Sequence, residues 1–395
     1  MTGDFIIIGG GASGLACAIK LKRINPNTSV TIIEKLTTPG KKILATGNGR
    51  CNLSNTDITI ENYNGDKELA SLVLSQFGTD ECLAFFKSIG LMTSSEEGRI
   101  YPLSRSASSV RDLLAMECKN LGVNIITDTK VISIEKKEDM FEIYTESGVY
   151  TSKVCVMALG GKAAAQHGTD GDGYRMLKSL GIRYEQIYPA LVRIKTDADT
   201  VRALRGVRVL GTVTVNGLGS ESGEIQFTDG GVSGIAVMQF SGQIAKRVAN
   251  GEKPVLHFDL CPNLSHDEIL NLLAEQKAHK PSAKAEEILI GIMNEKLAKV
   301  IAEGSNNDED IADKVKDFTL VANGTDSYKD AQVTHGGVGR DSLMPRSLQA
   351  LNVPGLFICG ELLNVDGMCG GYNLHFAWGS GILAAKEAAE FASNK

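Results

Sequence analysis

The segment Phe5-Ile-Ile-Ile-Gly-Gly-Gly-Ala-Ser-Gly14 decides the fold of this 395-residue chain. Its apolar residues predict a buried parallel strand, its glycines predict a tight turn, and residues 15–23 continue as a helix. Gly9 permits the turn, Gly11 lets a ligand approach the backbone, and Gly14 lets helix and strand pack closely. The helix N-terminus then presents unpaired N–H groups to a phosphate. The segment therefore predicts a dinucleotide site whose first contacts are Gly9, Gly11, Ala12, Ser13 and Gly14.

An acidic residue follows this turn at the distance that the dinucleotide interpretation requires. Residues 30–33 predict a second strand, and Glu34 ends it, 34 − 14 = 20 positions after Gly14. A carboxylate at that place can accept both hydroxyls of an adenosine ribose. We assign Lys35 and Lys42 to the same cofactor.

Composition and charge exclude several classes of protein. A net charge of −6 and a pI near 5.7 argue against nucleic acid or an anionic membrane as a partner. We expect a cytoplasmic protein, since there is no signal-peptide pattern and no apolar run near the roughly 20 residues that span a bilayer. The eight cysteines lack C-x-x-C spacing, which predicts reduced thiols. No metal-ligand spacing and no G-x-S-x-G elbow is visible, so we expect neither a metal site nor a serine hydrolase.

The order of predicted elements indicates an α/β fold with an insertion. Both ends of the chain contribute strands and helices to one Rossmann-like nucleotide domain, predicted as residues 1–190 plus 332–395. Short alternating segments separated by glycines predict a β-rich domain at 191–262 plus 312–331, where we expect the substrate. Residues 263–311 predict a small helical cap, broken by the polar run 304–310.

The loop at residues 39–54 is too polar and rich in glycine to be core. It directly follows the strand that carries Glu34, at the end of the sheet where ligands bind in doubly wound folds. A plain surface loop is the alternative. We expect it to present backbone amides and side chains to a polar, planar or anionic ligand through Thr46, Gly47, Asn48, Arg50, Cys51 and Asn52.

A second glycine-rich block lies at residues 359–374. A buried strand ends there at Gly360-Glu361, and Gly370-Gly371 begins the last helix. Because a helix N-terminus stabilises negative charge, this helix suits the anionic edge of a reduced flavin. Glu361 and Asp366 are candidates for holding ribityl hydroxyls, although Asp366 beside a glycine is also typical of a turn.

These blocks, taken in order, resemble the HI0933-like flavoprotein family. The resemblance covers the chain from end to end and is carried by GGGASG, TGNGRCN (46–52), GRIYPLS (98–104), SSVRDLL (108–114), ALGG (158–161), GTDGDGY (168–174) and CGELLNVDGMCGGYNLHFAWGSG (359–381). That family includes bile-acid Δ4,6-reductase-like proteins and aminoacetone oxidases. The resemblance implies FAD, a two-dinucleotide-type flavoprotein fold with an inserted β-barrel and a helical subdomain, and an isoalloxazine between TGNGRCN and GGYNL. It further implies cofactor contacts at Val131, Ala158, Gly160, Gly161, Gly360, Gly371, Tyr372, Asn373 and Leu374.

Three residues are candidates for catalysis. Arg50 can stabilise developing anionic charge, but a salt bridge that braces the loop is the alternative. Tyr101 can donate a proton, but a buried aromatic beside a proline is more common. His335 stands close to two glycines and can serve as acid or base, as can His375. We expect the thiol of Cys51 to be unreactive.

The sequence contains one dinucleotide fingerprint, at Gly9–Gly14. A dedicated NAD(P)H domain is therefore not expected. Either NAD(P)H binds transiently over the flavin, or electrons arrive from another donor or leave to oxygen. The first hypothesis is reduction of an activated C=C bond in a small or medium organic substrate, with hydride transfer at flavin N5. The second is oxidation of an amine such as aminoacetone by oxygen. A flavin-based redox sensor and an RNA-modifying flavoprotein are the alternatives from other classes.

Overall fold

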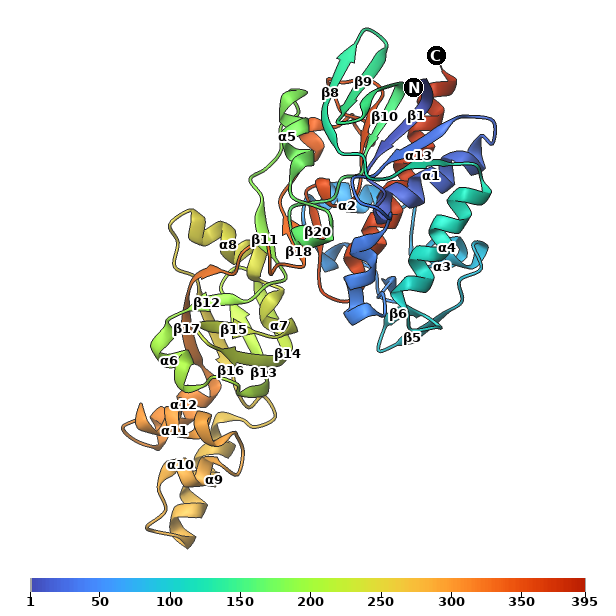
Figure 1. The fold of residues 1–395 in the computed structure, drawn as a ribbon. Coiled ribbons are helices and arrows are strands. Elements are labelled where there is room, and N and C mark those ends of the chain that lie inside the picture. The colour runs from blue at the N-terminus through green and yellow to red at the C-terminus, as the bar shows by residue number, and fades with distance from the viewer. Residues whose placement is uncertain (1, 395) are drawn as a thin grey trace. The chain divides into compact units, whose positions relative to one another are not determined.

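The computed structural model describes residues 2–394 and divides into two compact units (Figure 1). The first unit is Met1–Ile187 with Val333–Lys395, so both ends of the chain belong to it. The second unit is Tyr188–Gln332. No helix within residues 2–394 is long and apolar enough to cross a membrane.

A seven-stranded sheet forms the centre of the first unit. Its order is β7-β2-β1-β10-β9-β8, and β19 pairs with β10. The pairs β7–β2, β2–β1, β1–β10 and β10–β19 are parallel, which makes the sheet Rossmann-like, while β8, β9 and the start of β10 form an antiparallel meander. The strands are β1 (Thr2–Ile8), β2 (Val30–Ile33), β7 (Asn124–Ile126), β8 (Val131–Lys137), β9 (Met140–Thr145), β10 (Gly148–Met157) and β19 (Leu356–Ile358).

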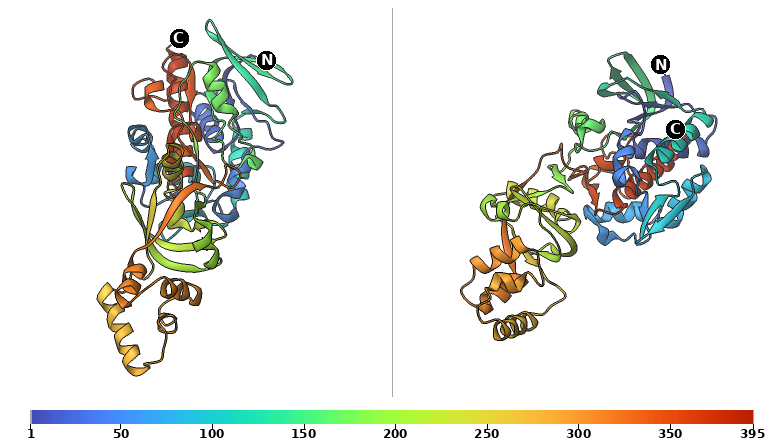
Figure 2. Two further views of the ribbon diagram at one scale, coloured as in Figure 1. Left: turned by 90° about the vertical axis from the view of Figure 1, so that its left-hand side faces the viewer. Right: turned by 60° about the horizontal axis from the view of Figure 1, so that its bottom comes forward.

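Two helices from opposite ends of the chain run side by side against this sheet (Figures 1 and 2). They approach so closely that a Cβ on Gly381 in α13 would lie 2.3 Å from the carbonyl oxygen of Ser13 in α1. This contact brings the C-terminal helix to the dinucleotide turn. The helices of the first unit are α1 (Ala12–Ile24), α2 (Lys67–Leu74), α3 (Thr79–Ser88), α4 (Ala107–Asn120), α5 (Asp172–Ser179) and α13 (Tyr372–Ser393).

Short elements shape the loops at the edge of the sheet. A three-stranded sheet has the order β3-β6-β5, and β20 pairs with β4. The first sheet joins residues 54–55 to residues 99–100, and the second joins residues 63–65 to residues 365–367. The elements are η1 (Lys41–Gly49), β3 (Ser54–Asn55), η2 (Ile60–Asn62), β4 (Tyr63–Gly65), β5 (Thr93–Glu96), β6 (Arg99–Pro102), η3 (Ala165–His167), β18 (Val333–His335), η4 (Arg340–Ser342), η5 (Gly360–Leu362) and β20 (Val365–Gly367).

The second unit contains a closed antiparallel barrel, ordered β12-β15-β14-β13-β16-β17. Alternate residues of its strands point inward, and Val213, Phe227 and Phe258 are fully buried. Helices α9–α12 gather at one end of the barrel (Figures 1 and 2). The elements are β11 (Tyr188–Ala190), β12 (Ile194–Thr196), α6 (Ala198–Ala203), β13 (Arg208–Val215), β14 (Gly219–Thr228), β15 (Gly231–Ser233), α7 (Ile235–Met238), α8 (Ser241–Ala249), β16 (Val255–Asp259), α9 (His266–His279), α10 (Ala285–Leu289), α11 (Glu295–Glu303), α12 (Asp308–Lys316) and β17 (Phe318–Thr325).

The polar run 304–310 breaks the helices of the second unit, as the sequence predicts, because α11 ends at Glu303. A further helix, α12, begins within the run at Asp308 and was not predicted. The Asn307 side chain accepts a hydrogen bond from Asp310 N at 2.8 Å, and three acidic residues fill the first turn, which stabilises a helix start. The stretch predicted as β-rich also contains α7 and α8, and the buried residues Ser241, Ile244 and Ala245 of α8 lie at helical spacing.

Candidate functional site

The three glycines of the dinucleotide turn have the geometry that their predicted roles require. A Cβ on Gly9 would lie 2.4 Å from the carbonyl oxygen of Ala158, and one on Gly14 would lie 2.0 Å from that of Gly9. A Cβ on Gly11 would meet no protein atom within 4 Å. Helix α1 begins directly after Gly11 with no side-chain cap and no acidic residue in its first turn. Open space above an uncapped helix N-terminus fits the pyrophosphate of a dinucleotide.

Glu34 lies buried at the carboxyl end of β2 and faces this turn. Its Oε2 accepts a hydrogen bond from Gly10 N at 2.7 Å, and its Oε1 accepts one from Leu36 N at 2.9 Å. A carboxylate oxygen has lone pairs for a second donor, so these bonds orient the group without preventing a contact with ribose hydroxyls. Thr129 N donates to the backbone oxygen of Glu34 at 3.0 Å, which places Val131 at the start of β8 close by.

Lysines beside the predicted adenosine contacts converge on one buried carboxylate. Lys35 Nζ lies 3.8 Å from Asp172 Oδ2, and Lys130 Nζ lies 3.3 Å from the same atom. Arg175 also pairs with Asp172, whose side chain is only 6% exposed. Asp172 therefore holds the segments after β2 and before β8 together. Sequence reasoning assigned no role to this residue of the GTDGDGY motif, because its two lysine partners are remote in sequence.

The two glycine-rich blocks lie side by side in the first unit. Asn55 Nδ2 donates to the Gly370 carbonyl oxygen at 3.0 Å, and Tyr63 Oη donates to that of Tyr372 at 3.1 Å. A Cβ on Gly371 would lie 2.3 Å from the carbonyl oxygen of Ser54. The loop that contains TGNGRCN thus packs directly against the start of α13.

The N-terminus of α13 faces a buried polar atom that has no partner. Asn52 Oδ1 makes no hydrogen bond within residues 2–394, and a Cβ on Gly371 would approach it to 2.7 Å. The helix itself has no side-chain cap and no acidic residue in its first turn. The isoalloxazine edge of a flavin carries one ring N–H between two carbonyl oxygens. An acceptor without a partner, beside a helix N-terminus that no side chain caps, fits that pattern.

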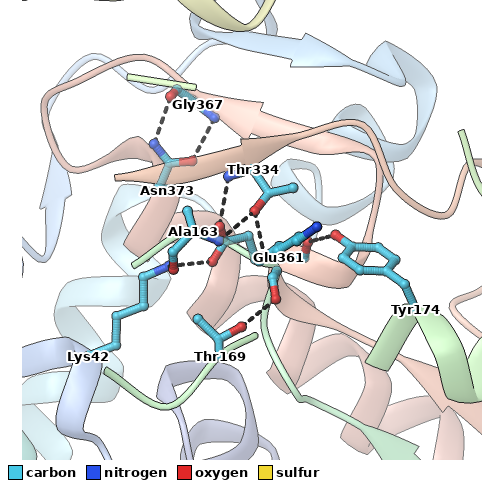
Figure 3. Close-up of polar contacts among 10 residues, drawn as sticks. Lys42, Ala163, Thr169, Tyr174, Thr334, Glu361, Gly367 and Asn373 are labelled. Carbon is cyan, nitrogen blue, oxygen red and sulfur yellow. Dashed lines mark hydrogen bonds and ion pairs between the residues drawn. The ribbon is translucent and has the colours of Figure 1, made fainter. Parts of the chain in front are cut away.

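Asn373 fixes the loop that leads into this helix (Figure 3). Its Oδ1 accepts a hydrogen bond from Gly367 N at 2.8 Å, and its Nδ2 donates to Gly367 O at 2.6 Å. The side chain therefore closes residues 367–373 into a compact turn. Both polar atoms of Asn373 are used within the protein, while Tyr372 and Leu374 belong to the first turn of α13.

Glu361 and Lys42 lie at the centre of a hydrogen-bond network that connects several segments of the chain (Figure 3). Glu361 Oε2 lies 2.8 Å from Lys42 Nζ, and Glu361 Oε1 accepts from Thr334 N at 2.8 Å. Thr334 Oγ1 accepts from Ala163 N at 3.2 Å, Tyr174 Oη donates to Glu361 O at 2.9 Å, and Thr169 donates to Gly161 O. Because the protein already occupies both oxygens of Glu361, a ribityl hydroxyl would share them. Thr169, Tyr174 and Thr334 were missed from the sequence.

Arg50 and Tyr101 contact each other beside the TGNGRCN loop. The Arg50 guanidinium carbon lies 4.9 Å from the centre of the Tyr101 ring, and that of Arg105 lies 5.0 Å from it. Arg50 also lies 3.8 Å from Glu96, which Arg105 contacts at 2.5 Å. Tyr101 is 3% exposed. These are the contacts of a braced loop, and a catalytic role for Arg50 or Tyr101 stays a prediction.

The thiols near this site are protonated at neutral pH. Burial raises the pKa of the Cys51 thiol to about 12, and burial also raises the pKa of Cys369. Thiolates are the reactive form, so both side chains act as packing groups. None of the eight cysteines forms a disulfide within the described residues.

The two histidines near the site differ in how their ring nitrogens are used. His375 is fully buried, with Nδ1 2.8 Å from Ser54 Oγ and Nε2 2.9 Å from the Phe77 carbonyl oxygen. A carbonyl only accepts, so Nε2 carries the proton and Nδ1 accepts from Ser54. Both nitrogens of His375 serve the fold. His335, in contrast, pairs through Nδ1 with Asp366 Oδ1 at 2.7 Å, a partnership that the sequence did not indicate.

His375 makes stability depend on pH. Burial lowers the pKa of His375 to about 4, while an unfolded histidine titrates near its ordinary value of about 6.5. Since the unfolded chain binds the proton first, the free energy of unfolding is highest above about pH 6.5 and falls as the pH drops toward 4. The expected loss is about 3 kcal/mol, measured by urea unfolding across that range. His375→Gln should flatten this fall, and an equally steep fall in that variant would contradict the assignment.

Comparison with known proteins places this site in context. The family model described as "HI0933-like protein Rossmann domain" matches residues 3–387. The 3-dehydro-bile acid delta(4,6)-reductase of Clostridium scindens is 37% identical over 97% of this chain and 98% of that protein. The ribosomal RNA dihydrouridine synthase of Haemophilus influenzae is 28% identical over 96% of this chain and 97% of that protein. Among solved structures, E. coli quinol fumarate reductase FrdA superposes with a TM-score of 0.54 at 15% identity, covering 100% of this chain and 71% of that one.

Proposed function

The chain belongs to the HI0933-like Rossmann family and is an FAD-dependent oxidoreductase, and from this premise we propose that it reduces an activated C=C bond with NAD(P)H as the electron donor. FAD, when bound, supplies the hydride chemistry. The names of two relatives carry the proposal. A 3-dehydro-bile acid delta(4,6)-reductase and a dihydrouridine synthase both saturate a C=C bond that is conjugated with a carbonyl group.

In this proposal, different residues of the first unit bind different parts of FAD. The turn Gly9–Gly14 and the N-terminus of α1 would hold the pyrophosphate, and Glu34 would hold the adenosine ribose. Asn52 and the N-terminus of α13 would hold the polar edge of the ring system. The uncapped α13 terminus would then stabilise negative charge on that edge, which favours the reduced form.

A transient nicotinamide site is part of the same proposal. Within residues 2–394 the glycine fingerprint of a dinucleotide fold occurs once, at the start of α1, and the second unit is a barrel with helices. NAD(P)H would therefore bind over the flavin ring, transfer its electrons to the flavin and dissociate before the substrate binds. The substrate in this scheme is a small or medium organic molecule with a carbonyl-conjugated double bond.

Anaerobic mixing experiments distinguish the proposed C=C reductase from an amine oxidase. We expect NADH or NADPH to bleach the visible absorbance of the purified yellow protein under argon, whereas aminoacetone leaves it unchanged. Bleaching by aminoacetone without nicotinamide would instead support the amine oxidase and overturn the reductase. Bleaching by NAD(P)H with no organic acceptor that restores the absorbance would identify a redox sensor.

Modification of RNA is a second candidate, because one relative is a ribosomal RNA dihydrouridine synthase. The charge of this chain weighs against it. The net charge is −6, and Asp and Glu outnumber Lys and Arg in the second unit as well. Binding to RNA requires Lys and Arg side chains that neutralise phosphates. A flat titration with ribosomal RNA at low salt is the expected result, and saturable binding followed by appearance of dihydrouridine would favour this candidate instead.

A further inference from the structure

A buried pair of side chains, His335 and Asp366, lies against the segment assigned to the flavin ring. His335 Nδ1 is 2.7 Å from Asp366 Oδ1, and the two side chains are 7% and 4% exposed. The other carboxylate oxygen, Asp366 Oδ2, accepts a hydrogen bond from Asn64 Nδ2 at 3.2 Å. Asn64 and Asp366 are also cross-strand partners in the β4–β20 pair. The carboxylate is thus held from two sides and orients the imidazole ring.

This arrangement determines which nitrogen of His335 can exchange a proton with a ligand. An ionised carboxylate only accepts hydrogen bonds, so the Nδ1 of His335 carries a proton. The Nε2 atom then has a bare lone pair in the neutral ring and an N–H in the imidazolium. It makes no hydrogen bond to any residue between 2 and 394. His375, in contrast, uses both of its nitrogens within the protein.

Hydrogen bonds place the His335–Asp366 pair on the segment that leads into the proposed ring site. Asp366 directly precedes Gly367, which Asn373 clamps at the start of α13. On the other side, Thr334 precedes His335 and donates its N–H to Glu361 Oε1. Residues 334–335 therefore contact the segment 361–373 at two places, Glu361 and Asp366. Arg50 and Tyr101, the other catalytic candidates, contact each other instead.

We propose that His335 is a catalytic residue that passes a proton to the substrate through Nε2, and that Asp366 is its positioning residue. The proposal rests on the C=C reduction proposed above. Saturation of the double bond adds a hydride, supplied by reduced FAD, to one carbon and a proton to the other. The Nε2–H bond of the imidazolium breaks, its electron pair stays on the nitrogen, and the π pair of the substrate forms the new C–H bond. Neutral His335, protonated on Nδ1, regains its proton from water.

The tautomer of His335 tests the positioning role without any turnover. In the Asp366→Asn variant, Asn64 still donates to position 366, so the new amide oxygen stays toward Asn64 and its NH2 group faces His335 Nδ1. We expect ¹⁵N histidine spectra to show the proton of the neutral ring on Nδ1 in the wild-type protein and on Nε2 in the variant. An unchanged tautomer in Asp366→Asn would overturn the positioning role.

The second unit offers a matched control. His257 Nδ1 lies 2.8 Å from Asp317 Oδ1, the same pair of atoms at nearly the same distance, but on a more exposed surface. Asp317→Asn should alter the His257 signals alone. It should leave the His335 signals, the FAD content and turnover as in the wild-type protein, and a change in the His335 signals would show that the spectra report a general effect.

Half-reaction kinetics test the catalytic role and separate it from the proposed function. We expect NAD(P)H to reduce His335→Gln at the wild-type rate, within about twofold, because that step needs no proton from His335. Anaerobic reoxidation by a 3-oxo-Δ4,6 bile acid should slow at least about 100-fold in His335→Gln, in the usual range for loss of a general acid. Asp366→Asn should slow it at least about tenfold.

The outcomes of this experiment distinguish failure of the proposed His335 role from failure of the proposed function. Reoxidation of both variants at the wild-type rate would overturn the role of His335 and leave the C=C reductase standing. A wild-type protein that NAD(P)H reduces but that neither the bile acid nor any simpler molecule with a carbonyl-conjugated C=C bond reoxidises would overturn the proposed function itself. FAD content and circular dichroism, measured on every variant, identify any variant that has failed to fold. If His335→Gln fails to fold, Asp366→Asn is used for the test instead.

Discussion

Gly14→Ala is expected to destabilise the first unit by about 3 kcal/mol and to abolish FAD binding. The new Cβ would lie 2.0 Å from the carbonyl oxygen of Gly9, which is backbone and cannot rotate away as a side chain can. Overpacking of this kind costs about 1–3 kcal/mol and sometimes more. Helix α1 would have to move away from β1, and the phosphate-binding N–H groups would move with it. Urea unfolding and the FAD content of the purified variant measure the two effects.

Gly11→Ala is the matched control for this prediction. Its Cβ would meet no protein atom within 4 Å, and the φ of −78° at Gly11 is open to alanine. The variant should therefore unfold like the wild-type protein. It should nevertheless bind FAD at least about tenfold more weakly, a loss of about 1.4 kcal/mol, because the methyl group occupies the space assigned to the pyrophosphate. Normal FAD affinity in Gly11→Ala would contradict that assignment.

Gly371→Ala is expected to have the second large effect, a decrease of about 2–6 kcal/mol in the free energy of unfolding together with loss of reduction by NAD(P)H. Gly371 has a φ of 102°, and its Cβ would lie 2.3 Å from the carbonyl oxygen of Ser54. Backbone strain and the steric clash each cost about 1–3 kcal/mol. The start of α13 would separate from the loop that contains Asn52. Unfolding measurements and stopped-flow reduction under argon follow the two losses.

Gly181→Ala isolates the part of this effect that comes from the backbone alone. Gly181 also has a left-handed φ, of 75°, but a Cβ there would meet nothing within 4 Å. Its cost should be about 1 kcal/mol, with unchanged flavin reduction. Equal losses in Gly181→Ala and Gly371→Ala would show that the close approach to Ser54 contributes nothing.

The features that sequence reasoning predicted best are local ones. The roles of Gly9, Gly11 and Gly14 follow from a strand, a turn and a helix that are contiguous in the chain, and the geometry at each glycine agrees. The FAD-dependent class came from the order of motifs along the whole chain, and the family match confirms it. Hydrophobic spacing located most strands but not the start of α12, which depends on the Asn307 cap and on acidic residues.

The side-chain pairs of the site could not be predicted from the sequence. Asp366 stands 31 positions from His335 and 302 from Asn64, and no periodicity relates such positions. The sequence alone allowed Asp366 to be a ribityl ligand or a turn residue. Only the pairing of β4 with β20 shows that its carboxylate lies between an amide and an imidazole. Asp172 is similar, since its lysines come from the segments after β2 and before β8.

Anaerobic titration of the NAD(P)H-reduced protein with molecules that contain a carbonyl-conjugated C=C bond, a 3-oxo-Δ4,6 bile acid among them, tests the central claim most directly. The account predicts that one of these acceptors restores the absorbance of oxidised flavin in full after one equivalent per FAD, and that the product has one C=C bond fewer. A protein whose flavin stays bleached with every such acceptor and regains its colour only when oxygen is admitted would contradict it.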